Sequence, residues 1–105
     1  MIISTTFEVG GKKLSEPLGI VQGNTVRARW FGRDIAAGLK NLIGGEIVSY
    51  TELMRDSRNQ AIERMIEEAK KLGADAVIGV RFATAEMMQG SAEFLAYGTA
   101  VKFKR

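Results

Sequence analysis

Apolar and polar residues follow patterns that predict two strands in the first 30 residues. Residues 1–9 are rich in isoleucine, threonine and valine, which favours a strand, and Gly10-Gly11 indicates a turn. A second strand is expected over residues 18–30, where Gly19 and Gly23 indicate a β-bulge or a close approach of another backbone. Beyond Gly23 this strand is expected to have one apolar and one basic face. The apolar face consists of Val26, Ala28 and Trp30, and the basic face of Thr25, Arg27 and Arg29.

Two helical patterns follow. Residues 32–43 carry apolar positions three and four apart, which predicts a helix that ends at Gly44-Gly45. Residues 46–72 predict a long helix with Gly73 as its C-terminal glycine, and a polar stretch at 56–60 interrupts its apolar stripe. This stretch is expected to face solvent, a partner subunit or a bend. The stripe contains Ile47, Tyr50, Met54, Ala61, Met65, Ala69 and Leu72, and Ile62 and Ile66 widen it.

The last third of the chain predicts two more strands. Residues 74–85 are expected to form a buried strand that includes Phe82, residues 87–91 a hairpin loop, and residues 92–103 a last strand. Both faces of that last strand are apolar. Because helices in a two-layer domain cover only one sheet face, a homo-oligomer is the simplest way to cover the other. The expected core is Ile35, Leu39, Met65, Ile66, Leu72, Val77 and Ile78.

These strands and helices together indicate one two-layer domain over residues 1–105. Composition narrows the chemistry. Cysteine and histidine are both absent, which excludes disulfides, thiolate nucleophiles, Ser-His-Asp triads and Cys/His zinc sites. No general acid–base pair is visible, so no catalysis is expected. No apolar run approaches a membrane span and no signal peptide is visible, so a cytoplasmic location is expected.

Four ordered motifs carry a resemblance to a known family. They are Gly19-Ile20-Val21-x-Gly23, Arg33-Asp34-Ile35-x-Ala37-Gly38 with Ile43-Gly44-Gly45-Glu46, Gly73-Ala74-Asp75-Ala76-Val77-Ile78-Gly79, and Gly98-Thr99-Ala100-Val101-Lys102. Together they resemble the YbjQ-like family of small bacterial proteins, which is labelled heavy-metal-binding. The resemblance implies a dodecin-like α+β subunit, with an antiparallel sheet and helices packed on one face. It also implies a ring-shaped homopentamer built through extra short strands. It implies no characterised activity.

Basic and acidic residues supply candidate ligand sites. Arg27, Arg29, Trp30 and Arg33 form a basic–aromatic cluster that suits phosphate or a nucleic-acid base, or that blunts an edge strand or forms salt bridges between subunits. Arg33-Asp34 opens the first predicted helix, as an anion site or as a cap with an ion pair. Asp75 is either a functional carboxylate or closes a turn by accepting backbone N–H groups. The net charge of +3 is mild, so nucleic acid is not the expected partner.

Metal binding is the weaker alternative, because soft metals prefer thiolate and imidazole ligands. Met87-Met88 offers thioethers, or simply fills a loop or an oligomer gap. Glu63, Glu67 and Glu68 offer oxygen ligands to a hard cation, or form a solvated, salt-bridged face. No resident metal or cofactor is therefore expected. The sequence favours a cytoplasmic homopentamer with a binding or scaffold role, with a small ligand or ion held at subunit interfaces.

Overall fold

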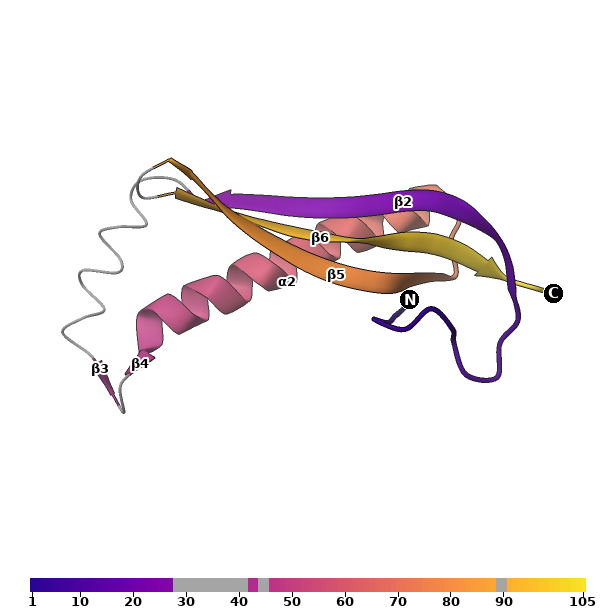
Figure 1. Ribbon diagram of the computed structural model, residues 1–105, viewed down its shortest axis with the longest axis horizontal. Coiled ribbons are helices and arrows are strands. Elements are labelled where there is room, and N and C mark those ends of the chain that lie inside the picture. The colour runs from indigo at the N-terminus through magenta and orange to yellow at the C-terminus, as the bar shows by residue number, and fades with distance from the viewer. Residues whose placement is uncertain (28–41, 44–45, 89–90) are drawn as a thin grey trace.

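The structure, a computed structural model, describes residues 1–27, 42–43, 46–88 and 91–105. Its elements are β1 (Ile2–Ile3), β2 (Leu14–Arg27), β3 (Leu42–Ile43), β4 (Glu46–Ile47), α2 (Val48–Lys71), β5 (Ala76–Met88) and β6 (Ser91–Phe103). Four strands form one sheet in the order β1-β5-β6-β2, and β3 pairs with β4 separately. Helix α2 packs on one face of the large sheet (Figure 1). The predicted α+β class and two-layer arrangement are thus confirmed.

The large sheet is mixed rather than purely antiparallel. Strand β6 pairs antiparallel with both β2 and β5, but β1 runs parallel to β5. The strand expected over residues 1–9 is therefore too long, since only Ile2–Ile3 join the ladder. The next residues instead donate and accept single hydrogen bonds with the bend in β5, such as Val80 N–H to the Ser4 carbonyl at 2.9 Å.

Both predictions for the glycines of β2 are confirmed. The register between β2 and β6 shifts on either side of Pro17, which places an irregularity between Leu14 and Gly19. At Gly23 the strand passes directly beneath α2. A Cβ atom built on Gly23 would overlap the Ala61 carbonyl oxygen and the Met65 amide nitrogen, and would lie 2.7 Å from the Arg64 Cβ. The absence of a side chain at this position therefore sets how closely the helix approaches the sheet.

Helix α2 confirms the long predicted helix and its C-terminal cap. It begins at Val48 rather than at residue 46, because Glu46 and Ile47 pair with Ile43 and Leu42 as strands. At the other end, Gly73 has φ +75°, which side chains other than glycine adopt only with strain. The amides of Gly73 and Ala74 donate to the carbonyls of Lys70 and Ala69, which is the Schellman pattern.

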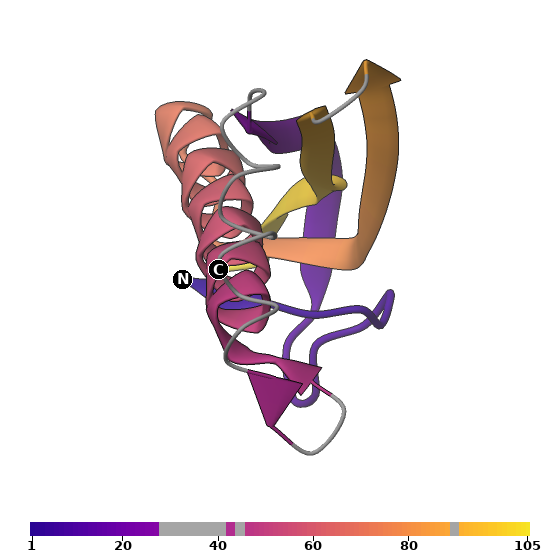
Figure 2. The same cartoon turned by 90° about the vertical axis from the view of Figure 1, so that its left-hand side faces the viewer.

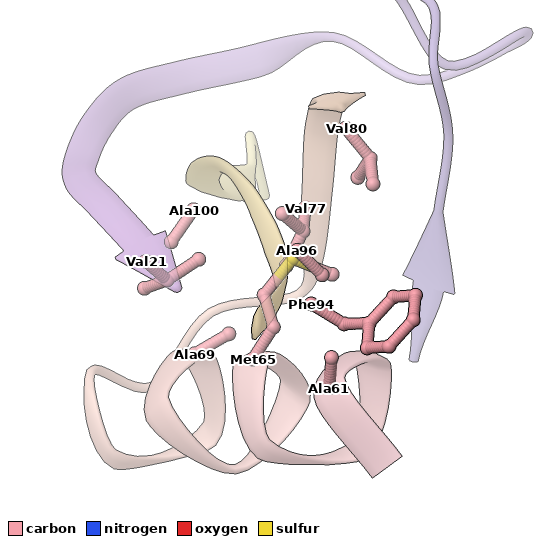
Figure 3. Packing of buried hydrophobic residues seen from close by; sticks show 9 residues of the cluster. All are labelled: Val21, Ala61, Met65, Ala69, Val77, Val80, Phe94, Ala96 and Ala100. Atoms are coloured by element: carbon pink, nitrogen blue, oxygen red, sulfur yellow. The ribbon is translucent and has the colours of Figure 1, made fainter. Parts of the chain in front are cut away.

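The core lies between α2 and the β2–β6 part of the sheet. Small residues dominate it, so helix and sheet approach closely (Figure 3). Ser57 is also completely buried, and its hydroxyl donates to the Leu53 carbonyl of its own helix at 2.8 Å. The expectation that the polar stretch at 56–60 interrupts the buried stripe is therefore wrong at Ser57, which continues the stripe. The main cluster contains Val21, Ala61, Met65, Ala69, Val77, Val80, Phe94, Ala96 and Ala100.

Several predicted burials are wrong because they depend on where α2 lies. Leu72 is 46% exposed because it follows the end of the helix, and Phe82 is 51% exposed because α2 does not reach that part of β5. On β2 the faces are reversed: Val26 is exposed, whereas Thr25 is only 2% exposed. Thr25 pairs with buried Phe94 of β6 and so belongs to the helix side of the sheet.

Two predicted boundaries also change. Leu42 and Ile43, expected in a helix, form strand β3, and the remainder of that predicted helix, with Ile35 and Leu39, lies outside the described residues. Strand β5 continues to Met88 and β6 starts at Ser91, so the predicted hairpin loop over 87–91 is too long.

The outer face of the sheet is partly covered by the chain itself. Val9, Leu14 and Phe103 pack against a second buried cluster of Ala76, Ile78 and Val101. Further along the same face, Ile20 is 79% exposed and Tyr97 is 38% exposed. The apolar outer face predicted from β6 is thus present, and the fold covers only one end of it.

Thr25 carries a buried hydroxyl that has no hydrogen-bond partner among the described residues. Burying a hydroxyl without a partner costs roughly 1–3 kcal/mol. We expect Thr25→Val to raise the free energy of unfolding in urea by about 1 kcal/mol. Thr99→Val, on a strand position where water reaches the side chain, serves as the control and should change stability by less than about 0.5 kcal/mol. A loss of stability in Thr25→Val would contradict this interpretation.

Candidate functional site

The basic–aromatic cluster predicted from the sequence lies almost wholly outside the described residues. Arg27 is the last residue of β2 and pairs with Ala92 of β6. Arg29, Trp30, Arg33 and Asp34 lie outside the described residues. The proposed anion and nucleic-acid roles of these five residues therefore stay predictions.

Asp75 lies in the turn between α2 and β5 and has a structural role there. Its carboxylate accepts the Phe103 amide at 2.8 Å, and it lies 3.5 Å from the Arg105 guanidinium. Its own amide donates to the Val101 carbonyl at 2.8 Å. The side chain thus accepts a backbone N–H, as the turn-closing interpretation expects, but the N–H comes from the end of β6. Through these contacts Asp75 holds the start of β5 against the end of β6 and Arg105.

The metal candidates do not come together. Among the described residues, no group of three or more acidic side chains is placed to hold a metal ion. Glu63, Glu67 and Glu68 are exposed on α2, and Glu68 pairs with Lys71 at 3.6 Å. Met87 and Met88 end strand β5 instead of forming a loop. With no cysteine or histidine in the chain, this donor set does not fit a soft heavy metal.

The feature that sequence reasoning missed is an uncovered apolar strip on the helix side of β5. Its exposed members are Ile3 and Phe82, at 37% and 51%, and it borders the buried core residue Val80; we call it the β5 strip. These side chains line, with Ser4 and Thr5, a shallow groove of about 140 Å³. Helix α2 packs on β2 and β6 and barely touches β5, which stands clear of the helix in Figure 2. The sequence showed the apolar residues of β5, but not that helix α2 leaves Phe82 open.

The β5 strip is not the only exposed apolar surface of the described chain. Ile20 and Tyr97 are exposed on the opposite, outer face of the sheet. The two surfaces lie on different sides of the sheet. Phe82 pairs with Ala96, which is buried on the helix side. Tyr97 follows Ala96 on β6, and successive side chains of a strand point to opposite faces. Groups of exposed apolar residues of this kind mark interaction surfaces. Within the described residues, α2 does not combine the length and hydrophobicity of a membrane-spanning helix.

Over the described residues, the fold and these surfaces define a class: a small α+β subunit in which helix α2 packs on a mixed four-stranded sheet, with apolar residues exposed on both sheet faces. The family model described as "Putative heavy-metal-binding" matches residues 1–104, and the chain belongs to this YbjQ-like family. The family resemblance seen in the sequence is thereby confirmed.

Relatives in several organisms match along the whole chain. A UPF0145 protein of Archaeoglobus fulgidus is 60% identical over 104 residues, which cover 99% of this chain and 96% of that protein. A UPF0145 protein of Thermosipho africanus is 58% identical and covers 100% of this chain and 97% of that protein. Because Archaeoglobus is an archaeon, the family is not confined to bacteria, and the bacterial source expected from the resemblance is not confirmed.

A solved structure supports the fold. A Pediococcus pentosaceus protein of unknown function from the DUF74 family aligns with a TM-score of 0.68 over 99% of this chain and 98% of that chain. The two sequences are 15% identical, so the likeness concerns the fold alone.

Proposed function

We propose that this chain is a cytoplasmic, self-assembling binding or scaffold module that forms a homopentameric ring and has no catalysis of its own. The observation that carries this proposal is the β5 strip. Phe82 is 51% exposed on a part of the sheet that helix α2 does not cover. Covering such an aromatic side chain is favourable, since each Å² of apolar surface removed from water contributes roughly 25 cal/mol.

The position of the exposed apolar residues favours a ring. A two-fold dimer brings the same patch of both subunits together, whereas a ring joins two different patches of each subunit. The described chain has two such patches, the β5 strip on the inner face and Ile20 with Tyr97 on the outer face. The number of five subunits follows from the family resemblance.

Catalysis is left out of the proposal on chemical grounds. The chain has no cysteine or histidine, and its described residues form no acidic cluster for a metal. The carboxylate of Asp75 is engaged with the Phe103 amide and with Arg105. The family's label of metal binding finds no matching donor set, so a binding role other than soft-metal coordination is the better supported function.

Phe82→Glu is expected to weaken self-association by about 30-fold or more, because burying a carboxylate in an apolar contact is costly. Light scattering of the eluting protein over a range of concentrations measures this effect. Leu72→Glu is the matched control: Leu72 is 46% exposed but lies beyond the end of α2, away from the β5 strip. It should leave the assembly unchanged.

A second variant keeps the test valid if Phe82→Glu does not fold. Ile3→Glu places a charge on the same strip from another strand and should also weaken association, with circular dichroism confirming the fold of each variant. Folded Phe82→Glu and Ile3→Glu proteins that assemble like the unchanged chain would refute the role of the β5 strip.

A further inference from the structure

A basic cleft lies at the end of the molecule where β6 leaves the sheet. It has a volume of about 500 Å³, within the range of small-molecule sites, and Gly10, Gly11, Val9 and Leu14 form part of its wall. Its charged lining residues are Lys12, Lys13, Lys104 and Glu8. We call it the lysine cleft. The segments that line it are the indigo loop before β2 and the C-terminal end of the chain, which lie side by side in Figure 1.

Strand pairing fixes the backbone of the lysine cleft. Leu14 pairs with Phe103 in the β2–β6 ladder, and the Lys104 amide extends this ladder by donating to the Lys13 carbonyl at 2.7 Å. The Lys12 ammonium lies 5.5 Å from the centre of the Phe103 ring, a cation–π distance. Three lysines from two distant parts of the sequence thus line one cavity, with Glu8 as the one acidic residue among the lining residues.

The turn in the cleft adds backbone donors. The Lys12 amide donates to the Val9 carbonyl at 3.0 Å, and Gly11 has φ +73°, as the third residue of a type II turn requires. The amides of Gly10 and Gly11, at the two central positions, donate to no backbone carbonyl among the described residues. In a type II turn these two N–H groups do not converge on one point, so each is available to a bound anion separately.

We propose that the lysine cleft binds the phosphate groups of a small anionic ligand. Phosphate carries close to two negative charges near neutral pH and several strong acceptor oxygens, which matches ammonium groups combined with backbone amides. The cavity is large enough for more than one phosphate group. The cleft is built from one chain only, so this inference does not depend on the proposed assembly.

Tripolyphosphate and ATP are the probes, and calorimetry at low ionic strength measures their affinity for the full chain. Lys13→Gln and Lys104→Gln should each weaken tripolyphosphate binding by about tenfold. Glu8→Gln should strengthen it, because the carboxylate repels the ligand. Lys70→Gln is the control: it removes the same charge from the exposed last turn of α2 and should leave affinity unchanged.

The two probes also identify the source of the phosphate. Binding of ATP that is tighter than that of tripolyphosphate supports a nucleotide, and equal or weaker binding of ATP supports a free polyphosphate. No measurable heat with either probe would overturn the proposal. An equal loss of affinity in Lys70→Gln and Lys13→Gln would also overturn it, since attraction by the net charge would then explain the binding.

Discussion

Gly23→Ala is expected to lower the free energy of unfolding by about 3–5 kcal/mol, because a single added methyl group would meet the backbone of a helix. The added Cβ would overlap the Ala61 carbonyl oxygen and the Met65 amide nitrogen of α2. These are backbone atoms of a regular helix, so no side-chain rotation relieves the clash. The helix would have to move off the β2–β6 surface, which opens the core.

Gly10→Ala provides the control for this substitution. A Cβ at Gly10 meets nothing within 4 Å, and its φ is not in the left-handed region. Its effect should stay within about 0.5 kcal/mol. Both variants are compared by urea unfolding at one protein concentration, because assembly makes apparent stability concentration-dependent. A Gly23→Ala protein as stable as Gly10→Ala would show that α2 does not lie against β2 as described.

Met65→Ala is expected to destabilise the protein by about 2–5 kcal/mol. Met65 is completely buried and is the largest side chain of α2 in the core, between Ala61 and Ala69 (Figure 3). Four of the eight other residues in this cluster are alanine and three are valine, and such short side chains cannot extend into the space that truncation leaves. The cost therefore includes a cavity as well as lost transfer free energy.

Leu72→Ala separates true core positions from positions that only follow the helical pattern. Leu72 continues the apolar stripe of the sequence but is 46% exposed, so its truncation should cost about 1 kcal/mol or less. Urea unfolding of both variants gives the comparison. A larger loss in Leu72→Ala than in Met65→Ala would contradict the packing described for α2.

The sequence was most informative where structure depends on near neighbours. The periodicity of residues 46–72 and the cap at Gly73 act locally, and their predictions are confirmed by α2 and its C-terminal hydrogen bonds. Val77, Ile78 and Met65 were expected in the core and are buried.

The sequence was less informative where burial depends on which strands the helix covers. Thr25 and Val26 are successive residues of β2, so their side chains point to opposite faces of the sheet. Only the position of α2 decides which of the two is buried. The same holds for Phe82, which looks like a core residue until the helix is placed over β2 and β6. Ser57 shows the opposite error, because its hydroxyl is satisfied within its own helix and so tolerates burial.

The lysine cleft could not be recognised from spacing. Lys12-Lys13 and Lys104 are far apart in the sequence, and neither position differs in its pattern from other exposed lysines of the chain. The local hint was a glycine pair followed by two lysines. Only the register of β2 against β6, with Leu14 opposite Phe103, shows that the two groups meet.

Self-assembly is the central claim, and native mass spectrometry of the unmodified protein, purified without chelators, tests it most directly. The β5 strip and the exposed outer face predict a closed assembly of identical chains, with five copies and no free single chain at micromolar concentration. A bound ligand would add a fixed mass to that assembly. A folded protein found only as single chains would contradict the claim, because Phe82 and Tyr97 would then be exposed without any partner.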